Sequence, residues 1–387
     1  MAPTRPRVAL LGATGSIGTQ TLDVLREERE RFELVAISGG QRLAELAVIA
    51  KEFSVGSIGV VSERDRDELG TLVGPGVEVL VGADGLAELA TRADVVVNAV
   101  VGFAGLPVTL SALSAGKRLA LANKESLIAA APLVAKVRRT PGAELLPIDS
   151  EHCAIHQCLE GSTLPGHPDV RAIHLTASGG PFRGMTKEEL QHVTKRDALQ
   201  HPTWTMGPKI TVDSSTLMNK GLEVLEASAL FGVEVERVNV VVHPQSIVHS
   251  MVEYVDGAVL AQLSLPDMRL PIAYCLGSPV RLSHGWGRID FTQALSLDFE
   301  APDREAFGAL DLAYAASRLG GAAPAWLSAA NEIAVEAFLN DQIPWSRIVP
   351  LVADVLDQYE PDPLNSLDSL FENDATARRL AHGMVPR

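Results

Sequence analysis

The first 150 residues alternate between short apolar runs and helix-like segments, and this alternation limits the possible folds more than any other feature of the sequence. Seven short apolar runs predict strands: RVALLG, ELVAIS, SIGVV, VEVLVG, DVVVNAV, RLALAN and ELLPID. Amphipathic segments such as TQTLDVLREERE and LAELAVIAKEF separate them. Strands that alternate with helices are typical of a parallel sheet covered by helices on both faces. Ligands of such sheets bind at the carboxyl ends of the strands.

The pattern changes after residue 150. RAIHLTAS and VNVVVH predict further strands, and SIVHSMVEYVDGAVLAQLS predicts a hairpin that turns at Asp256-Gly257. The segment 178–209 is rich in Gly and Pro and predicts a mobile flap, with an ordinary surface loop as the alternative. We therefore predict an α/β protein with an N-terminal Rossmann-like parallel sheet (1–150), an α+β catalytic domain with the flexible flap (151–280), a linker (281–305) and a C-terminal α-helical bundle (306–387).

Composition narrows the classes of partner. The 387 residues carry a formal net charge of −15, which argues against a nucleic-acid partner because such partners need a basic surface. No apolar stretch approaches the roughly 18 residues of a membrane span, and MAPTRPRVALLG lacks the pattern of a signal peptide. Cys153, Cys158 and Cys275 contain no CxxC pair, which favours a reducing compartment. We expect no nucleic-acid partner, no membrane partner and a cytoplasmic location.

Three glycines follow the first predicted strand. In VALLGATGSIGTQTLDVL, Gly12, Gly15 and Gly18 stand between that strand and an amphipathic segment. Glycines at this position allow a tight turn and a close approach of the backbone to a pyrophosphate, which the following helix N-terminus stabilises. The spacing GxxGxxG differs from the commoner GxGxxG, and a purely structural turn is the alternative.

The end of the second predicted strand indicates which dinucleotide is bound. An NAD site usually has an acidic residue there, whereas this chain reads AISGGQRL. No carboxylate is present to repel a 2′-phosphate, and Arg42 is available to pair with one. The sequence therefore favours NADP, with an ordinary solvated role for Arg42 as the alternative.

Two acidic side chains follow the seventh predicted strand. LLPIDSEHCAI places Asp149 and Glu151 at the strand end, where two carboxylates can bind a hard divalent cation. Zinc ligation by His152, Cys153 and Cys158 is a weaker alternative than simple packing of the cysteines. A third oxygen ligand has to come from elsewhere in the chain.

The segment KITVDSSTLMNKGLEVLEA is the source we favour for that ligand. If a helix begins near Ser214 or Ser215, Asn219 and Glu223 stand four residues apart on one face. Ser214, Asn219 and Lys220 would then form a phosphate site and Glu223 would reach the metal. A helix cap followed by a solvated polar face is the alternative.

Further polar residues follow the sixth predicted strand and lie in the flap. LALANKESLI places Asn123, Lys124 and Glu125 at the cofactor edge of the sheet, where a lysine can polarise a carbonyl or bind an anion. A solvated lysine at a helix start is the alternative. His201, in QHPTWTMG, is a candidate for phosphate binding, whereas His243 and His249 are expected in the core or an interface.

Six stretches together resemble the 1-deoxy-D-xylulose 5-phosphate reductoisomerase family: GATGSIGTQTLDV, LANKESL, PIDSEHCAI, SGGPFR, HPTWTMGPKITVDSSTLMNKGLEVLEA and HPQSIVHSMVEY. The resemblance is collinear over nearly the whole chain. It implies conversion of a small phosphorylated sugar, 1-deoxy-D-xylulose 5-phosphate, to 2-C-methyl-D-erythritol 4-phosphate in the non-mevalonate isoprenoid pathway. It also implies NADPH, one divalent cation (Mn²⁺, Mg²⁺ or Co²⁺), a rearrangement followed by hydride reduction, and a homodimer.

The resemblance assigns roles to the matching positions. The metal ligands would be Asp149, Glu151 and Glu223, which with Lys124 make up the expected catalytic set. The substrate would contact Lys124, Ser150, Glu151, Ser178, His201, Trp204, Met206, Ser214, Asn219, Lys220 and Glu223. NADPH would contact Thr14, Gly15, Ser16, Ile17, Gly39, Gly40, Gln41, Arg42, Asn123, Glu125 and Gly207. Ser215 receives no role.

Two other functions stay open on the residues alone. One is a metal-independent NADP-dependent reductase such as a semialdehyde or homoserine dehydrogenase, which shares the dinucleotide-binding half but needs no group of three acids. The other is a catalytically silent NADPH-binding regulator, which would tolerate the loss of Asp149 or Glu223.

Overall fold

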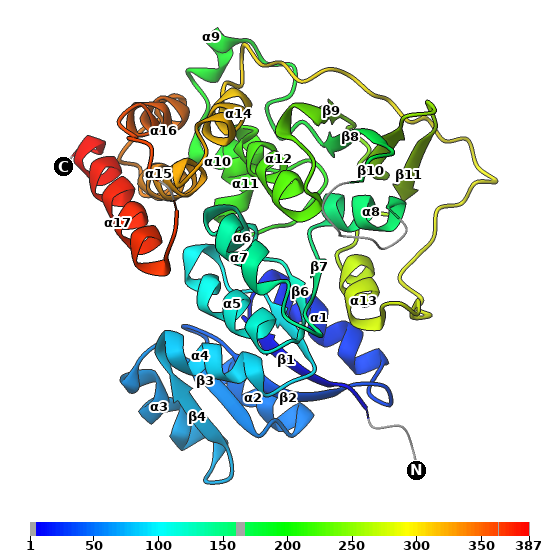
Figure 1. The fold of residues 1–387 in the computed structure, drawn as a ribbon, viewed down its shortest axis with the longest axis vertical. Helices are drawn as coiled ribbons and strands as arrows, with labels where there is room; N and C mark the ends of the chain where they lie inside the picture. The colour runs from blue at the N-terminus through cyan, green and yellow to red at the C-terminus, as the bar shows by residue number, and fades with distance from the viewer. Residues whose placement is uncertain (1–4, 160–166, 363, 387) are drawn as a thin grey trace. The chain divides into compact units, whose positions relative to one another are not determined.

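The computed structural model describes residues 5–159, 167–362 and 364–386 (Figure 1). The chain forms two compact units, and each of them combines segments that are far apart in the sequence. The first unit comprises Met1–Leu127, Leu133–Cys153 and Asp267–Trp286, and the second comprises Ile128–Pro132, Ala154–Pro266 and Gly287–Arg387. The predicted domain boundaries at residues 150, 280 and 305 stay predictions.

The first unit contains a seven-stranded parallel sheet in the order β4-β3-β2-β1-β5-β6-β7. Each of the seven predicted strands is present: β1 (Arg7–Leu11), β2 (Glu33–Ser38), β3 (Ser57–Val60), β4 (Glu78–Val81), β5 (Val95–Asn98), β6 (Arg118–Leu121) and β7 (Glu144–Pro147). The order reverses between β1 and β5, which is where such sheets bind ligands.

Helices connect these strands. The crossovers from β1 outward to β4 use α1 (Ser16–Glu27), α2 (Leu43–Phe53) and α3 (Glu63–Val73). Return crossovers use α4 (Gly82–Thr91), η1 (Gly102–Gly105) and α5 (Leu106–Ser114). Because parallel crossovers are right-handed, these two groups cover opposite faces of the sheet. The chain passes between the two units within α6 (Lys124–Ala129), α7 (Ala131–Val137) and α8 (Ser150–Cys158).

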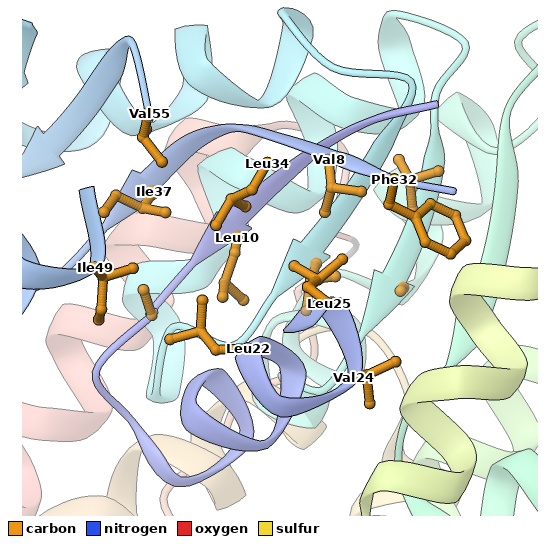
Figure 2. Close-up of a cluster of buried hydrophobic side chains, with 14 of the residues drawn as sticks. Val8, Leu10, Leu22, Val24, Leu25, Phe32, Leu34, Ile37, Ile49 and Val55 are labelled. Carbon is orange, nitrogen blue, oxygen red and sulfur yellow. The ribbon is translucent and has the colours of Figure 1, made fainter. Parts of the chain in front are cut away.

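One late segment completes the core of the first unit. Helix α13 (Arg269–Gly277) packs against α1 and contributes Ile272, Cys275 and Leu276 to the buried cluster around β1. Cys275 Sγ also donates a hydrogen bond to the carbonyl of Pro147 at 3.2 Å. Figure 2 shows Leu10 of β1 and Leu22 and Leu25 of α1 in this cluster. The α1 helix is therefore fixed between the sheet and α13.

The second unit contains a four-stranded sheet in the order β11-β10-β8-β9. Its strands are β8 (Val170–Ala177), β9 (Val238–Val242), β10 (Val248–Tyr254) and β11 (Val259–Leu263). The predicted hairpin is confirmed, because β10 and β11 pair antiparallel on either side of Asp256-Gly257. The sheet is mixed, since β8 and β9 pair in parallel.

The other regular elements of this unit are helices. The segment between β8 and β9 forms α9 (Lys187–Leu190), α10 (Lys195–Ala198), α11 (Pro208–Ser215), α12 (Met218–Phe231) and η2 (Val235–Arg237). The predicted C-terminal helices are α14 (Ala309–Leu319), α15 (Ala323–Leu339), η3 (Trp345–Arg347), α16 (Ile348–Leu356) and α17 (Leu367–Met384). Among the described residues, no helix is both long and apolar enough to cross a membrane.

The predicted helix start near Ser214 or Ser215 is wrong. Helix α11 ends at Ser215, and α12 begins only at Met218. Leu217 lies between the two helices with φ +60°, in the left-handed region, and this conformation ends one helix before the next begins. Ser214 therefore belongs to the last turn of α11 rather than to a helix N-terminus.

Candidate active site

The glycine turn leaves the N-terminus of α1 open. Gly15 is the N-cap residue and provides no side-chain cap, and the first turn of α1 contains no acidic residue. Gly12 has φ +93°, and a Cβ on Gly18 would lie 2.2 Å from the carbonyl oxygen of Gly12. The backbone is thus tightly packed on one side, while the free N–H groups and the helix dipole suit an anion.

The end of β2 lies beside this turn. Ser38 Oγ accepts a hydrogen bond from the Gly12 N–H at 3.1 Å, and the Arg42 guanidinium donates one to the Thr14 carbonyl. Thr14 Oγ1 would lie 3.5 Å from a Cβ on Gly39. The structure thus brings together two predicted groups of cofactor residues within the first unit: Thr14, Gly15, Ser16 and Ile17 with Gly39, Gly40, Gln41 and Arg42.

Asn123 follows β6 and is bound to backbone groups. Its Nδ2 donates to the carbonyl of Gly102 at 2.6 Å and to that of Val100, and its Oδ1 accepts from the Ser126 N–H at 2.7 Å. The side chain therefore holds the end of β5 against the start of α6. Its predicted contact with the cofactor, like that of Glu125, stays a prediction.

Lys124 and Asp149 form a buried ion pair at the ends of β6 and β7. Lys124 Nζ lies 2.5 Å from Asp149 Oδ2, and the two side chains are 7% and 9% exposed. Burial alone would raise the pKa of Asp149, but the charge of Lys124 and the interaction with His152 outweigh burial and hold that pKa well below its usual range. Asp149 is therefore an ionised carboxylate, as a metal ligand must be.

Helix α8 presents the other predicted residues of this strand end. The Glu151 N–H donates to Asp149 Oδ1 at 3.3 Å, and Ser150 Oγ donates to the Glu151 carboxylate. His152 Nδ1 lies 3.4 Å from Asp149 Oδ1, although His152 is outside the predicted site. Its spacing of three residues from Asp149 on a helix was the available signal.

In the second unit, the flap histidine contacts the end of β8. His201 Nε2 and Ser178 Oγ are 3.0 Å apart, and His201 Nδ1 accepts from the N–H groups of Thr203 and Trp204 at 3.1 and 2.9 Å. Because Nδ1 accepts, Nε2 carries the ring proton and donates a hydrogen bond to Ser178 Oγ. Burial lowers the pKa of His201, so the neutral form dominates at pH 7.

Three predicted residues on α12 interact directly. Asn219 Nδ2 donates to Glu223 Oε1 at 2.5 Å, and the Lys220 ammonium pairs with Glu223 Oε2. The Lys220 and Glu223 side chains are 5% and 2% exposed. The predicted common face of Asn219 and Glu223 is confirmed, although the helix begins later than expected.

The remaining flap residues lie between His201 and α11. Trp204 packs near His249 of β10, with ring centroids 6.4 Å apart. Met206 is half-buried, and Gly207 is the N-cap residue of α11. The second unit thus contains predicted substrate residues at the end of β8, in the flap and on α11 and α12: Ser178, His201, Trp204, Met206, Ser214, Asn219, Lys220 and Glu223.

His249 is expected to make the protein acid-sensitive. Burial, together with His243 and Lys220, lowers its pKa from 6.5 to about 4. The unfolded chain takes up this proton below pH 6.5 and the native state does not. The free energy of unfolding should therefore fall between pH 6.5 and 4, by up to about 3 kcal/mol from this residue. Urea unfolding across this pH range should show that the free energy of unfolding depends less on pH in His249→Gln than in the parent chain. A change at the exposed His192, His192→Gln, should leave the pH dependence of the parent chain unaltered.

Comparison with known proteins gives the family. A family model described as 1-deoxy-D-xylulose 5-phosphate reductoisomerase matches residues 8–131, and models of its C-terminal domains match residues 145–231 and 263–380. A 1-deoxy-D-xylulose 5-phosphate reductoisomerase of Chloroherpeton thalassium is 46% identical over 380 residues, covering 97% of each chain. The chain belongs to the 1-deoxy-D-xylulose 5-phosphate reductoisomerase family. The resemblance read from the six stretches is confirmed.

Solved structures of the reductoisomerase family share the fold. The Zymomonas mobilis enzyme in complex with NADPH is 44% identical, covers 98% of this chain and 99% of its own, and superposes with a TM-score of 0.90. A reductoisomerase structure with NADPH, fosmidomycin and magnesium is 42% identical over 98% of both chains, with a TM-score of 0.91. The predicted α/β fold class is thereby confirmed.

Proposed function

We propose that this chain converts 1-deoxy-D-xylulose 5-phosphate to 2-C-methyl-D-erythritol 4-phosphate with NADPH and one divalent cation, as a step of the non-mevalonate isoprenoid pathway. The observation that carries the proposal is 46% identity to a reductoisomerase over 97% of both chains. Related structures contain NADPH and magnesium, which are the cofactors that the residues of this chain suit.

The first unit provides the features that NADPH requires. The uncapped N-terminus of α1 suits the pyrophosphate, and the packing around Gly12 and Gly18 leaves no room for side chains there. Arg42 lies beside the turn, and SGGQR, which ends β2 and follows it, contains no acidic residue, so a 2′-phosphate there would meet the Arg42 guanidinium, which also pairs with Glu45 at 3.3 Å. Bound NADPH would supply the hydride for the reduction.

The acidic residues suit a divalent cation. Asp149, Glu151 and Glu223 would hold Mg²⁺, Mn²⁺ or Co²⁺ through carboxylate oxygens, which are ligands these cations accept. Asp149 and Glu223 are each buried beside a lysine, and the charge of Lys124 holds the pKa of Asp149 well below its usual range. The cation would act as a Lewis acid toward the ketone and hydroxyl oxygens of the substrate.

The remaining predicted residues bind and enclose the substrate in this proposal. Lys124 and Ser150 contact its reacting end, where the Lys124 ammonium stabilises negative charge on oxygen. Its phosphate is bound by Ser178, Ser214, Asn219 and Lys220, with His201 of the flap beside Ser178. Neutral His201 donates only one ring proton, and its bond to Ser178 orients that hydroxyl. Trp204 and Met206 exclude water from the reacting atoms.

Turnover in the presence and absence of metal tests the proposal. We expect NADPH absorbance to decay with 1-deoxy-D-xylulose 5-phosphate and added Mg²⁺ or Mn²⁺, and excess chelator to stop the decay reversibly. Decay that persists in chelator would instead favour a metal-independent reductase. NADPH binding without any decay would favour the silent regulator.

Lys220 is expected to act mainly in substrate affinity. Lys220→Ala removes a buried ammonium from the proposed phosphate site, so KM for the phosphorylated sugar should rise about 100-fold with a smaller change in kcat. Steady-state kinetics with varied sugar and saturating NADPH measures both constants. Lys195→Ala, which removes a flap ammonium paired with Asp341 at 2.6 Å, is the control and should keep KM within about twofold.

A homodimer and a cytoplasmic location complete the proposal. Strand β11 is an edge of its sheet, and its Val259 and Leu260 are 50% and 46% exposed. An exposed apolar edge suits pairing with a second copy of the chain. All three cysteines are buried and none of them forms a disulfide in the described part of the chain, which suits a reducing compartment. Light scattering coupled to size exclusion would measure the mass, and a monomer at micromolar concentration would contradict the dimer.

A further inference from the structure

Two long-range hydrogen bonds hold the turn that carries Ser214. Asn331 of α15 donates from Nδ2 to Asp213 Oδ1 at 2.8 Å. Trp345 of η3 donates from Nε1 to Ser215 Oγ at 2.8 Å. The residues on either side of Ser214 are thus each bound by a partner more than a hundred positions later in the sequence, on helices of the C-terminal segment.

These bonds are buried, while Ser214 is partly accessible. Asp213 and Ser215 are 1% exposed and Asn331 is fully buried. Water therefore cannot replace a donor that is removed, and the acceptor would be left unsatisfied. Lys209 Nζ lies 2.9 Å from Asp213 Oδ2, so the Asp213 carboxylate is held at both oxygens.

The turn also fits tightly against the loop that carries Ser178. A Cβ on Gly180 would lie 2.5 Å from the Ser214 carbonyl oxygen, so these two backbones are in direct contact. Trp345 additionally packs edge-on against Phe182 of the same loop, with ring centroids 5.3 Å apart. Leu217 keeps its left-handed backbone, which persists only where surrounding contacts hold it. Helix α15 packs against α11 and supplies part of that support (Figure 1).

We infer that Asn331 and Trp345 are positioning residues for the phosphate of the substrate. Acting through Asp213 and Ser215, they place Ser214 against the Ser178 loop, so that the hydroxyl groups of both serines point at one phosphoryl group. The inference rests on the proposed function for the identity of the substrate. Under this inference the C-terminal helices contribute to substrate affinity through the phosphate. They have no part in the reaction at the other end of the sugar.

Asn331→Leu and Trp345→Phe test the inference, because each removes one of the two donors and leaves an apolar side chain in its place. In each variant, KM for 1-deoxy-D-xylulose 5-phosphate should rise about tenfold or more, with kcat within about threefold and KM for NADPH unchanged. Stabilisation of the protein by inorganic phosphate in thermal melts should shrink in parallel.

Trp326→Phe is the matched control. Trp326 lies on α15, as Asn331 does, and its Nε1 donates to Asn373 Oδ1 of α17 at 2.8 Å rather than to a residue of the Ser214 turn. This variant loses one hydrogen bond of the same kind and should keep the KM of the parent chain. Exchange of the two partners, in Asp213→Asn with Asn331→Asp, restores an amide donor opposite a carboxylate. The exchanged variant should recover part of the KM lost by Asn331→Leu.

Four results would overturn the inference: unchanged KM in both donor variants, an equal KM rise in Trp326→Phe, a loss confined to kcat, or no recovery in the exchanged variant. If one of the two donor variants fails to fold, the KM of the other still shows whether its donor affects substrate affinity. A parent chain that binds phosphate in melts but does not turn over the sugar would refute the proposed function alone. Thermal melts of the variants with inorganic phosphate would then still show whether Asn331 and Trp345 affect phosphate binding.

Discussion

Glu223→Gln should reduce turnover by about a thousandfold or more while NADPH still binds. The change keeps the shape of a side chain that is only 2% exposed and removes the charge that a divalent cation requires. It also replaces an acceptor of the Lys220 ammonium with a neutral amide. Turnover is measured by NADPH oxidation at saturating sugar and metal, and cofactor binding by NADPH titration with fluorescence detection. Metal titration should show a weakened affinity.

Asp374→Asn is the control for Glu223→Gln. Asp374 is a buried carboxylate of the same unit and accepts from Arg378 Nε at 2.7 Å. Its neutralisation breaks a comparable ion pair outside the proposed site and should leave turnover within about threefold. Near-normal turnover of Glu223→Gln would refute its assignment as a metal ligand. An equal loss of turnover in Asp374→Asn would mean that breaking any buried ion pair of this unit explains the effect of Glu223→Gln.

Gly18→Ala should destabilise the first unit and abolish NADPH binding. The added Cβ would lie 2.2 Å from the carbonyl oxygen of Gly12 and 2.6 Å from the carbonyl carbon of Ala13. The glycine turn or α1 must therefore shift, at a cost of about 3 kcal/mol, because both neighbours are backbone atoms. Chemical denaturation gives the stability, and NADPH titration well below the unfolding midpoint gives the affinity.

Gly70→Ala is the matched change for Gly18→Ala. Gly70 lies within α3 of the same unit, and its added Cβ would meet no atom within 4 Å. Alanine is the better helix former, so this variant should be slightly more stable and bind NADPH normally. If Gly18→Ala bound NADPH with parental affinity, the close packing of the turn would have no part in cofactor binding.

The strands of the first unit were predictable because their signal is local. Runs such as DVVVNAV are buried on both faces of a parallel sheet, so they are apolar throughout and end at polar residues. The polar ends also marked the candidate site: Asn123 and Lys124 follow β6, and Asp149 follows β7. The Lys124–Asp149 ion pair follows from the adjacency of these two strands.

Other features depend on contacts that the local sequence does not record. The break between α11 and α12 falls at Leu217, a residue with no turn preference, so the expected helix start was placed too early. Asp213 reads as a helix cap, yet its partner Asn331 lies 118 positions later. The contact of His152 with Asp149 had only a weak local signal, their spacing of three residues.

The return of α13 to the first unit has a consequence for folding during synthesis. Ile272 and Leu276 belong to the core around β1, but residues 154–266 lie between them and the rest of that unit. At about 5–20 residues per second, a ribosome needs on the order of ten seconds to make this intervening stretch. Throughout that interval, the face of α1 that later meets α13 lacks its partner. The core of the nascent first unit therefore stays incomplete until α13 has been synthesised. Until then, its exposed apolar surface can bind chaperones or lead to aggregation.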